Sequence, residues 1–188
     1  MEPEDAELVS AWYDDARVAT LMGDLPISHA HRRARYERAS REPEDDVFRF
    51  VICRLEDDVP VGRTDLFELD RGNGSCAFGI TIGDPADWGR GYGADALNAL
   101  MDFAFGQLRL ERVWLDSETT NLRAQAAYRN AGFEVEGTLR RAWFQDGVWK
   151  DDLRMALLRD RWLGLHRPRS WDLLADADPD STAKPVGT

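Results

Sequence analysis

The chain has 188 residues, a net charge of −11 at neutral pH and an isoelectric point near 4.7, so a nucleic-acid partner held through its phosphates is disfavoured. With 43% hydrophobic residues it is long enough to bury a substantial core, and we expect one compact domain. The beginning, MEPEDAELVSAWYDD, lacks a basic start followed by an apolar run, and no stretch of about 18 apolar residues occurs anywhere. We therefore expect a cytoplasmic protein without a membrane partner.

Helical spacing dominates the first forty or so residues. Apolar side chains recur at helical intervals over residues 4–22, and Ser28 is a candidate N-cap for a second helix that runs to about Ser40. His29 and His31 are two positions apart in this second helix, so their rings point to different faces and do not converge on a metal. We interpret this helix as a solvated basic surface.

Three strands are predicted next. The segments 47–55, 59–69 and 75–83 are rich in β-branched and aromatic residues and are separated by turn sequences, which indicates an antiparallel meander. Cys53 and Cys76 lie in these strands, and we expect both thiols to be buried and reduced.

Helices and strands alternate in the second half of the chain. Leu97 begins an apolar stripe at helical spacing that ends at Gly106, and residues 112–117 form the next strand. Asn121 is a candidate N-cap for a short helix that stops at Gly132. This strand–helix–strand order predicts one crossover connection in the sheet.

A hairpin and a polar tail complete the predicted order. The segments 133–145 and 148–158 have strand composition and are joined by an Asp-Gly turn. The order of elements indicates an α/β (α+β) chain with a mainly antiparallel mixed sheet. We predict a single domain over residues 1–165 and a loosely held tail over residues 166–188.

Three glycines stand close together in DWGRGYGADAL, at Gly89, Gly91 and Gly93. Bare backbone at a helix N-terminus presents several N–H groups without obstruction, and the helix dipole adds positive charge, so a phosphate or diphosphate fits there. A dinucleotide-binding fingerprint has a different spacing and context, and a nucleotide P-loop needs a Gly-Lys-Ser/Thr ending that is absent. Taken alone, the segment fits a simple tight turn equally well.

Two further motifs accompany the glycine segment. GITIGDPADWGRGYGADAL is followed by NLRAQAAYRNAGF and then by DGVWKD, and in this order they resemble the acyl-CoA-binding half of the GNAT N-acyltransferase superfamily. The sequence resembles most the branch that includes the ribosomal-protein alanine N-acetyltransferases and the spermidine N-acetyltransferases. The resemblance covers roughly residues 45–160 and implies the GNAT fold, in which a mainly antiparallel mixed sheet opens at a central splay between flanking helices.

The resemblance implies a site for acetyl-CoA as co-substrate. Main-chain groups of the strand before the glycines would bind the pantetheine arm, and the glycine loop would bind the diphosphate. The implied cofactor-binding residues are Ile80, Ile82, Gly83, Trp88, Gly89, Arg90, Gly91, Gly93, Ala94, Asn121 and Tyr128. Tyr128 is also the implied catalytic acid, which protonates the leaving thiolate. The structural alternatives are a helix cap for Asn121 and a packed aromatic ring for Tyr128.

The position of the general base departs from the family pattern. Relatives commonly carry a glutamate where this chain has Ala77, and we expect Asp116, on the strand across the splay, to be the catalytic carboxylate. Asp65 and Glu68, on a meander strand, are alternatives, and each of these carboxylates also fits a solvated strand residue. Asp151 matches the DGxWxD pattern, and we expect it to fix the hairpin.

These observations predict an N-acetyltransferase that moves an acetyl group from acetyl-CoA to a primary amine by direct attack in a ternary complex, without a metal. A protein N-terminus, a polyamine or a small amine each fits an acidic cleft as acceptor, so the acceptor stays open. Because Ala77 replaces the usual acid, the alternative is an acyl-CoA-binding sensor or scaffold that has lost catalysis.

Relatives begin with an edge strand that has no counterpart before MEPEDAELV. Unpaired backbone groups at a sheet edge must be satisfied by a partner chain, by another segment or by solvent. We therefore expect either a homodimer or a tail that docks through Trp171, Leu173 and Leu174.

Overall fold

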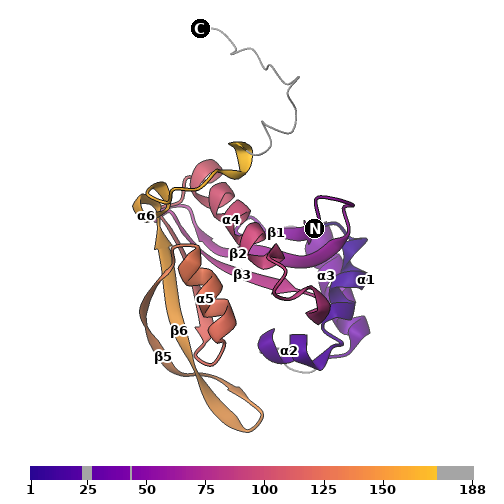
Figure 1. Cartoon of the computed structure of the whole chain (residues 1–188). Coiled ribbons are helices and arrows are strands. Elements are labelled where there is room, and N and C mark those ends of the chain that lie inside the picture. Colours follow the sequence, from indigo (N-terminus) through magenta and orange to yellow (C-terminus); the bar gives the residue numbers. More distant parts are fainter. Residues whose placement is uncertain (23–26, 43, 173–188) are drawn as a thin grey trace, which may run out of the picture.

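The computed structural model describes residues 1–22, 27–42 and 44–172, and a six-stranded sheet in the order β1-β2-β3-β4-β6-β5 forms its centre (Figure 1). The elements are α1 Asp5–Trp12, α2 Ala16–Met22, α3 His29–Arg41, β1 Phe48–Cys53, β2 Pro60–Asp70, β3 Ser75–Ile82, a 3₁₀ turn Pro85–Asp87, α4 Tyr92–Asp102, a π-helical turn Phe103–Gln107, β4 Arg112–Glu118, α5 Leu122–Asn130, β5 Glu134–Gln145, β6 Val148–Leu158 and α6 Arg159–Leu163. No helix within the described ranges has the length and apolarity needed to cross a membrane.

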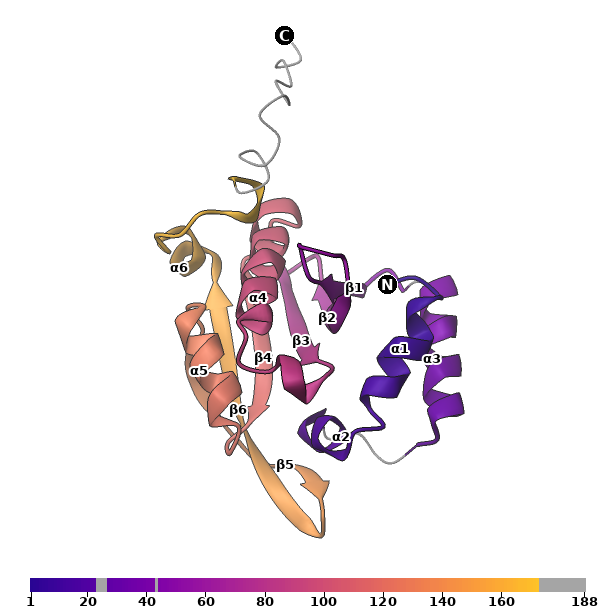
Figure 2. The ribbon, with the colours of Figure 1, turned by 45° about the vertical axis from the view of Figure 1, so that its right-hand side comes forward.

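The sheet is antiparallel except at its centre. β3 and β4 run parallel, and the crossover between them passes through α4. Their pairing begins at Ser75 and Arg112 and stops at Ala77 and Trp114. Beyond that point the two strands diverge, as Figure 2 shows. The predicted mainly antiparallel mixed sheet with a central splay is therefore confirmed.

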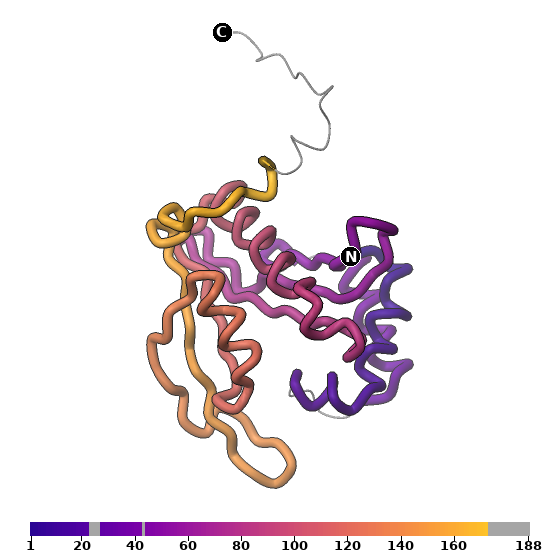
Figure 3. Tube along the Cα trace, in the orientation of Figure 1, coloured from indigo at the N-terminus to yellow at the C-terminus, as the bar shows by residue number. Residues whose placement is uncertain are grey.

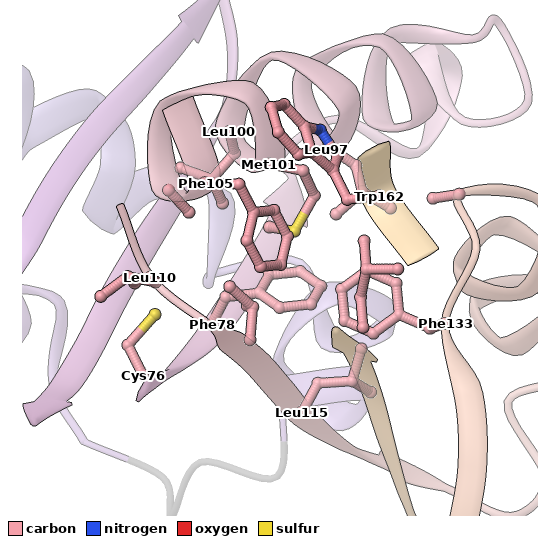
Figure 4. Close-up of a cluster of buried hydrophobic side chains, with 14 of the residues drawn as sticks. Cys76, Phe78, Leu97, Leu100, Met101, Phe105, Leu110, Leu115, Phe133 and Trp162 are labelled. Atoms are coloured by element: carbon pink, nitrogen blue, oxygen red, sulfur yellow. The ribbon is translucent and has the colours of Figure 1, made fainter. Parts of the chain in front are cut away.

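The two faces of β3 meet different helical layers. Phe78 belongs to the main core together with Leu97 of α4 and Phe133 (Figure 4). On the opposite face Gly83 lies directly beneath Trp12 of α1, because a Cβ added to Gly83 would stand only 2.0 Å from the indole ring. α4 and α5 therefore cover one face of the sheet, and α1 and α3 cover the other (Figure 2).

The first helical segment is broken rather than continuous. α1 ends at Trp12 and α2 begins at Ala16, so the single helix expected over residues 4–22 is wrong. Asp15 accounts for the break, because its carboxylate accepts a hydrogen bond from the backbone N–H of Arg17 at 2.8 Å and so starts a new helix. The break lets α2 leave the direction of α1 (Figure 3).

Two local predictions are also wrong. The helix expected to end at Gly106 is α-helical only to Asp102 and continues as the π-helical turn. Cys76 is buried as expected, but Cys53 is exposed, because it ends β1 at the edge of the sheet. Both cysteines are free thiols.

Asp102 anchors the described part of the C-terminal tail to α4. Its side chain is fully buried and accepts hydrogen bonds from Trp162 Nε1, from the Arg167 guanidinium and from the Ser170 backbone N–H. Burial alone would raise the pKa of this carboxyl, but the three donors outweigh burial and hold the pKa below its ordinary value. The ionised form of Asp102 therefore helps to hold the tail in place.

Trp171 is the described member of the three side chains predicted to dock the tail. Its ring packs against Trp162 with centroids 6.4 Å apart, and it lies so close to Gly106 that an added Cβ there would stand 2.8 Å away. The first residues of the predicted tail are thus packed on the domain and not loosely held. Leu173 and Leu174 lie outside the described residues.

β1 forms one edge of the sheet. The Met1 ammonium donates a hydrogen bond to Arg49 O on this strand at 3.0 Å, and no strand precedes α1 within the described residues. The docked part of the tail lies at α4 and does not cover β1. A homodimer therefore stays a prediction.

Candidate active site

A cavity of about 470 Å³ occupies the splay between β3 and β4. The glycine loop, α4, α5 and α2 complete its walls. It is lined by most of the residues predicted to bind the coenzyme, namely Ile80, Ile82, Trp88, Gly89, Gly91, Gly93, Ala94, Asn121 and Tyr128. The predicted catalytic carboxylate, Asp116, also lines it. The motifs that are separate in the sequence thus meet at one place.

β3 turns unpaired backbone groups toward this cavity. Gly83 N–H donates to Val61 O on β2 at 2.8 Å, and successive residues of a strand direct their backbone groups to alternate sides. The N–H and C=O groups of Ile80 and Ile82 therefore point to the side that β4 has left. The carbonyl oxygen of Ile82 accepts a hydrogen bond from Trp88 Nε1 at 2.9 Å. An extended ligand with amide groups can pair with the others, as an added strand would.

Gly83 and Arg90 are the predicted cofactor residues that do not line the cavity. The N–H of Gly83 is bonded to β2 and Trp12 covers its α-carbon, so this glycine serves packing. The guanidinium of Arg90 forms an ion pair with Asp87 at 3.0 Å and lies 5.4 Å from the centre of the Tyr92 ring. Residues adjacent to Gly83 and Arg90 line the cavity, but these two residues do not.

The glycine loop has a backbone that glycine alone adopts easily. Gly89 and Gly91 have φ angles of +77° and +94°, and Gly91 is the N-cap of α4. Gly93 differs, because an added Cβ there would stand at an ordinary 3.5 Å from Ile82 Cγ1. The turn thus requires Gly89 and Gly91, whereas Gly93 keeps the cavity wall open. N–H groups at the start of α4 make this wall suitable for an anion.

Asn121 joins the cavity wall to the start of α5. Its side-chain oxygen accepts a hydrogen bond from Ala124 N–H at 3.2 Å, so its role as a helix cap is confirmed. The same residue lines the cavity. A contact with the coenzyme through the side-chain amide nitrogen is compatible with the cap and remains a proposal.

Tyr128 lies on the wall that α5 contributes. Its ring packs edge-on against Phe78, with centroids 5.6 Å apart, and stands 6.1 Å from Phe133. Burial raises the pKa of Tyr128 to about 12, so the phenol stays protonated at neutral pH. The Tyr128 ring is therefore packed against other aromatic rings, which was the structural alternative for this residue. Tyr128 also lines the cavity.

The carboxylates on the cavity wall are already paired with cations. The Arg154 guanidinium binds both oxygens of Asp116, and its terminal nitrogen is 2.8 Å from Oδ2. Lys150 Nζ donates to Glu118 at 2.9 Å, and Asp87 is paired as described above. Burial acts to raise the pKa of Glu118, but the hydrogen bonds from Lys150 and a neighbouring threonine outweigh it and lower the pKa. None of these groups is an unpaired base.

The alternative carboxylates lie elsewhere. Asp65 pairs with Arg63 beside Tyr13, and burial raises the pKa of Asp65. Glu68 is exposed at an irregular point of β2, where its φ is +52°. Ala77, the position at which the resemblance implied a glutamate, is fully buried. In the described part of the chain no group of His, Cys, Asp and Glu side chains is arranged to hold a metal.

A family model described as an acetyltransferase (GNAT) domain matches residues 1–134. The chain belongs to this GNAT family. The probable N-acetyltransferase YjcK of Bacillus subtilis is 32% identical over 72% of this chain and 75% of its own length. Spermidine N(1)-acetyltransferase of Escherichia coli is 28% identical over 90% of this chain and 84% of its own length. The predicted superfamily, its branch and the enzyme class, an N-acetyltransferase, are confirmed.

Solved structures confirm the GNAT fold. Spermidine N-acetyltransferase from Vibrio cholerae, in complex with CoA and spermine, superposes with a TM-score of 0.79 over 87% of this chain and 95% of that chain. The identity between the two sequences is 24%, so this likeness shows the fold and not the substrate.

In this GNAT chain α2 forms a wall that the sequence did not predict. α2 contributes the apolar side chains of Val18, Leu21 and Met22. Thr81 Oγ1 on β3 donates to Met22 Sδ at 3.0 Å, and Gln145 Nε2 in the hairpin donates to Thr20 O at 3.1 Å. α2 therefore contacts both β3 and the β5–β6 hairpin. No local pattern in residues 16–22 signals this, because the contact partners are more than fifty residues away.

Arg123 is a second lining residue that the sequence did not predict. Its guanidinium carbon lies 4.2 Å from the centre of the Trp88 ring, so a side chain of α5 meets the residue that precedes the glycine loop. A signal was available, since Arg123 stands two positions after Asn121 in the NLRAQAAY motif.

Proposed function

We propose that this GNAT enzyme transfers an acetyl group from acetyl-CoA to a primary amine by direct attack in a ternary complex. The observation that carries the proposal is the splay, where β3 offers unpaired backbone groups to a cavity that ends in a glycine loop and a helix N-terminus. Pantetheine is an extended chain of amides attached to a diphosphate, so one molecule matches both features. The CoA bound in the Vibrio cholerae relative supports this assignment.

Each wall of the cavity has a task in this reaction. N–H groups on the open side of β3, near Ile82, polarise the thioester carbonyl, and the amine nitrogen bonds to the carbonyl carbon. The carbon–sulfur bond then breaks, and Tyr128 stabilises the departing sulfur by hydrogen bonding or protonation. The product nitrogen loses its extra proton to water.

The paired carboxylates suggest that no side chain acts as a strong base. Asp116, predicted as the catalytic carboxylate, is held by Arg154 in a two-pronged ion pair. We therefore assign Asp116 a structural task, the ion pair that joins β4 to β6 beside the cavity. The amine attacks after it has lost its proton to solvent, and the rate follows the fraction of neutral amine.

The acceptor is proposed to carry an apolar body next to its amino group, as the N-terminal residue of a peptide does. Val18, Leu21 and Met22 make the α2 wall apolar. A polyamine needs free carboxylates along its length, but Asp116 and Glu118 are already neutralised by internal cations. Polyamines, bound by the Vibrio cholerae relative, are the second candidate.

Thiol release from acetyl-CoA, with product masses recorded for a panel of amines, tests the proposal. The panel contains spermidine, a small amine and short peptides with alanine or leucine first. We expect peptide acetylation at the N-terminus with a higher kcat/KM than for spermidine. Faster transfer to spermidine would refute the acceptor assignment. Binding of acetyl-CoA without release by any amine would favour the sensor or scaffold alternative. A cytoplasmic location and a homodimer stay predictions.

A further inference from the structure

Two lining side chains from different walls of the cavity contact each other. Trp88 precedes the glycine loop, and its indole is fixed by the hydrogen bond from Nε1 to Ile82 O at 2.9 Å. Arg123, near the N-terminus of α5, lays its guanidinium over this ring with the carbon 4.2 Å from the ring centre. A guanidinium stacked on an aromatic face keeps the N–H groups around its edge available to a ligand.

Arg123 is also the only cationic side chain among the residues that line the cavity in the described structure. The other charged lining residues are Asp87, Asp116 and Glu118, and each has a cationic partner of its own. No ion pair of Arg123 occurs within residues 1–22, 27–42 and 44–172. In a chain of net charge −11, this unpaired cation is the clearest place for an additional anionic group of a ligand.

The proposed co-substrate has two separate anionic groups, a diphosphate and a 3′-phosphate on the ribose. Backbone N–H groups at Gly91 and the start of α4 suit the diphosphate, and they do so without a side chain. The 3′-phosphate is a terminal monoester with about two negative charges near neutral pH, and the planar fork of an arginine binds such a group through two hydrogen bonds. Arg123, on the cavity lining and in contact with the residue directly before the glycine loop, complements this second group.

We propose that Arg123, held against Trp88, binds the 3′-phosphate of the coenzyme and makes the enzyme select acetyl-CoA over its 3′-dephospho form. This inference rests on the proposed function, because it assumes that the cavity binds acetyl-CoA. It adds a selectivity residue that lies outside the glycine loop. Trp88 acts as a positioning residue, since its bonded indole fixes the plane on which the guanidinium lies.

Calorimetric titration of acetyl-CoA and of 3′-dephospho-acetyl-CoA into the parent and into Arg123→Gln tests the proposal. We expect the parent to bind acetyl-CoA more tightly than the dephospho form. Arg123→Gln should weaken acetyl-CoA by about 10- to 100-fold, the range expected for hydrogen bonds between charged groups, and should change the dephospho form by less than about twofold. Both measurements report binding and need no acceptor.

Arg129→Gln is the matched control, because it removes the same charge from the exposed side of the same helix and lies outside the cavity lining. It should leave both affinities at the parental values. An equal loss for both ligands in Arg123→Gln would overturn the proposal, since the arginine would then serve the diphosphate or the loop. No loss for either ligand would also overturn it. If the parent binds neither ligand, the proposed function itself is wrong.

Discussion

Replacement of Tyr128 by phenylalanine isolates the contribution of one hydroxyl group to catalysis. The ring is held against Phe78 and Phe133, so Tyr128→Phe keeps the packing and removes only the proton donor. Burial raises the pKa of Tyr128 to about 12. A thiol has a pKa near 8.5, so full proton transfer to the leaving thiolate is uphill by about 3.5 units, or roughly 5 kcal/mol. The phenol therefore acts mainly through a hydrogen bond to the sulfur as charge develops.

A hydrogen bond to a charged group contributes about 1.5 to 3 kcal/mol, which corresponds to about 10- to 100-fold in rate. We expect Tyr128→Phe to lower kcat by this amount, at the low end of the range typical of general acid catalysis. The dissociation constant of acetyl-CoA should stay unchanged, because the proposed binding groups are the backbone of β3 and the glycine loop. Thiol release under saturating acetyl-CoA and amine, with calorimetry for the affinity, gives both quantities.

The dependence of the rate on pH is a second test of the role of the Tyr128 hydroxyl. Because the pKa of Tyr128 lies far above neutrality, the phenol stays protonated from pH 6 to about 10. The value of kcat/KM should therefore rise with pH as the acceptor ammonium loses its proton, without a fall below about pH 10. Tyr36→Phe, which removes a buried phenol outside the cavity, serves as the control. Parental kcat in Tyr128→Phe with the best amine would refute the assignment of this hydroxyl.

Three further predictions concern the loop, the tail anchor and the paired carboxylate. Gly93→Val should keep the melting temperature, because a Cβ fits at 3.5 Å from its neighbour, and should weaken acetyl-CoA at least about tenfold; Gly91→Ala, at φ +94°, should instead lower stability by about 1 to 2 kcal/mol. Asp102→Asn should cost about 3 to 5 kcal/mol in denaturant unfolding, since it removes the fully buried carboxylate and leaves the partly buried Arg167 guanidinium without its partner. The pKa of Asp102 is lowered by folding, so this stabilisation is present above about pH 4 and is lost as the pH falls further. If the free energy of unfolding of Asp102→Asn falls with acid pH as steeply as that of the parent, this prediction is wrong. Asp116→Asn should lower kcat by less than about fivefold, because it removes only a partly exposed ion pair. A loss of several hundredfold would instead show that Asp116 is the general base.

Features set by local sequence were predictable. The Asp-Gly turn between β5 and β6 has positive φ at both Asp146 and Gly147, as a tight hairpin turn requires. Asn121 caps α5 through its side-chain oxygen, and Gly91 takes the left-handed conformation at the start of α4. Asp151 fixes the hairpin as predicted, because its carboxylate accepts the backbone N–H of Arg141 at 2.7 Å. Each of these depends on contacts within a few residues or across one turn.

Features set by distant contacts were not predictable. The sequence places Asp116 on a strand but does not indicate its partner. Arg154 lies 38 positions later, and only the pairing of β4 with β6 brings it into contact with Asp116. The ion pair of Asp102 was equally unpredictable, since its partner Arg167 is 65 positions away in the sequence. The apolar wall of α2 depends on the helix break at Asp15. Sequence patterns therefore predicted which backbone segments line the candidate site but not the ion pairs that its side chains form.

A crystal structure of the protein with coenzyme A bound tests the central claim most directly. The account predicts that the pantetheine arm pairs with the open side of β3 at Ile80 and Ile82 and that the diphosphate lies at Gly91 and the start of α4. A second cavity of about 420 Å³ lies between β1 and α4 and is lined in part by Phe50 and Phe103. Coenzyme bound in that second cavity, or a splay that closes without ligand contacts to β3, would contradict the account.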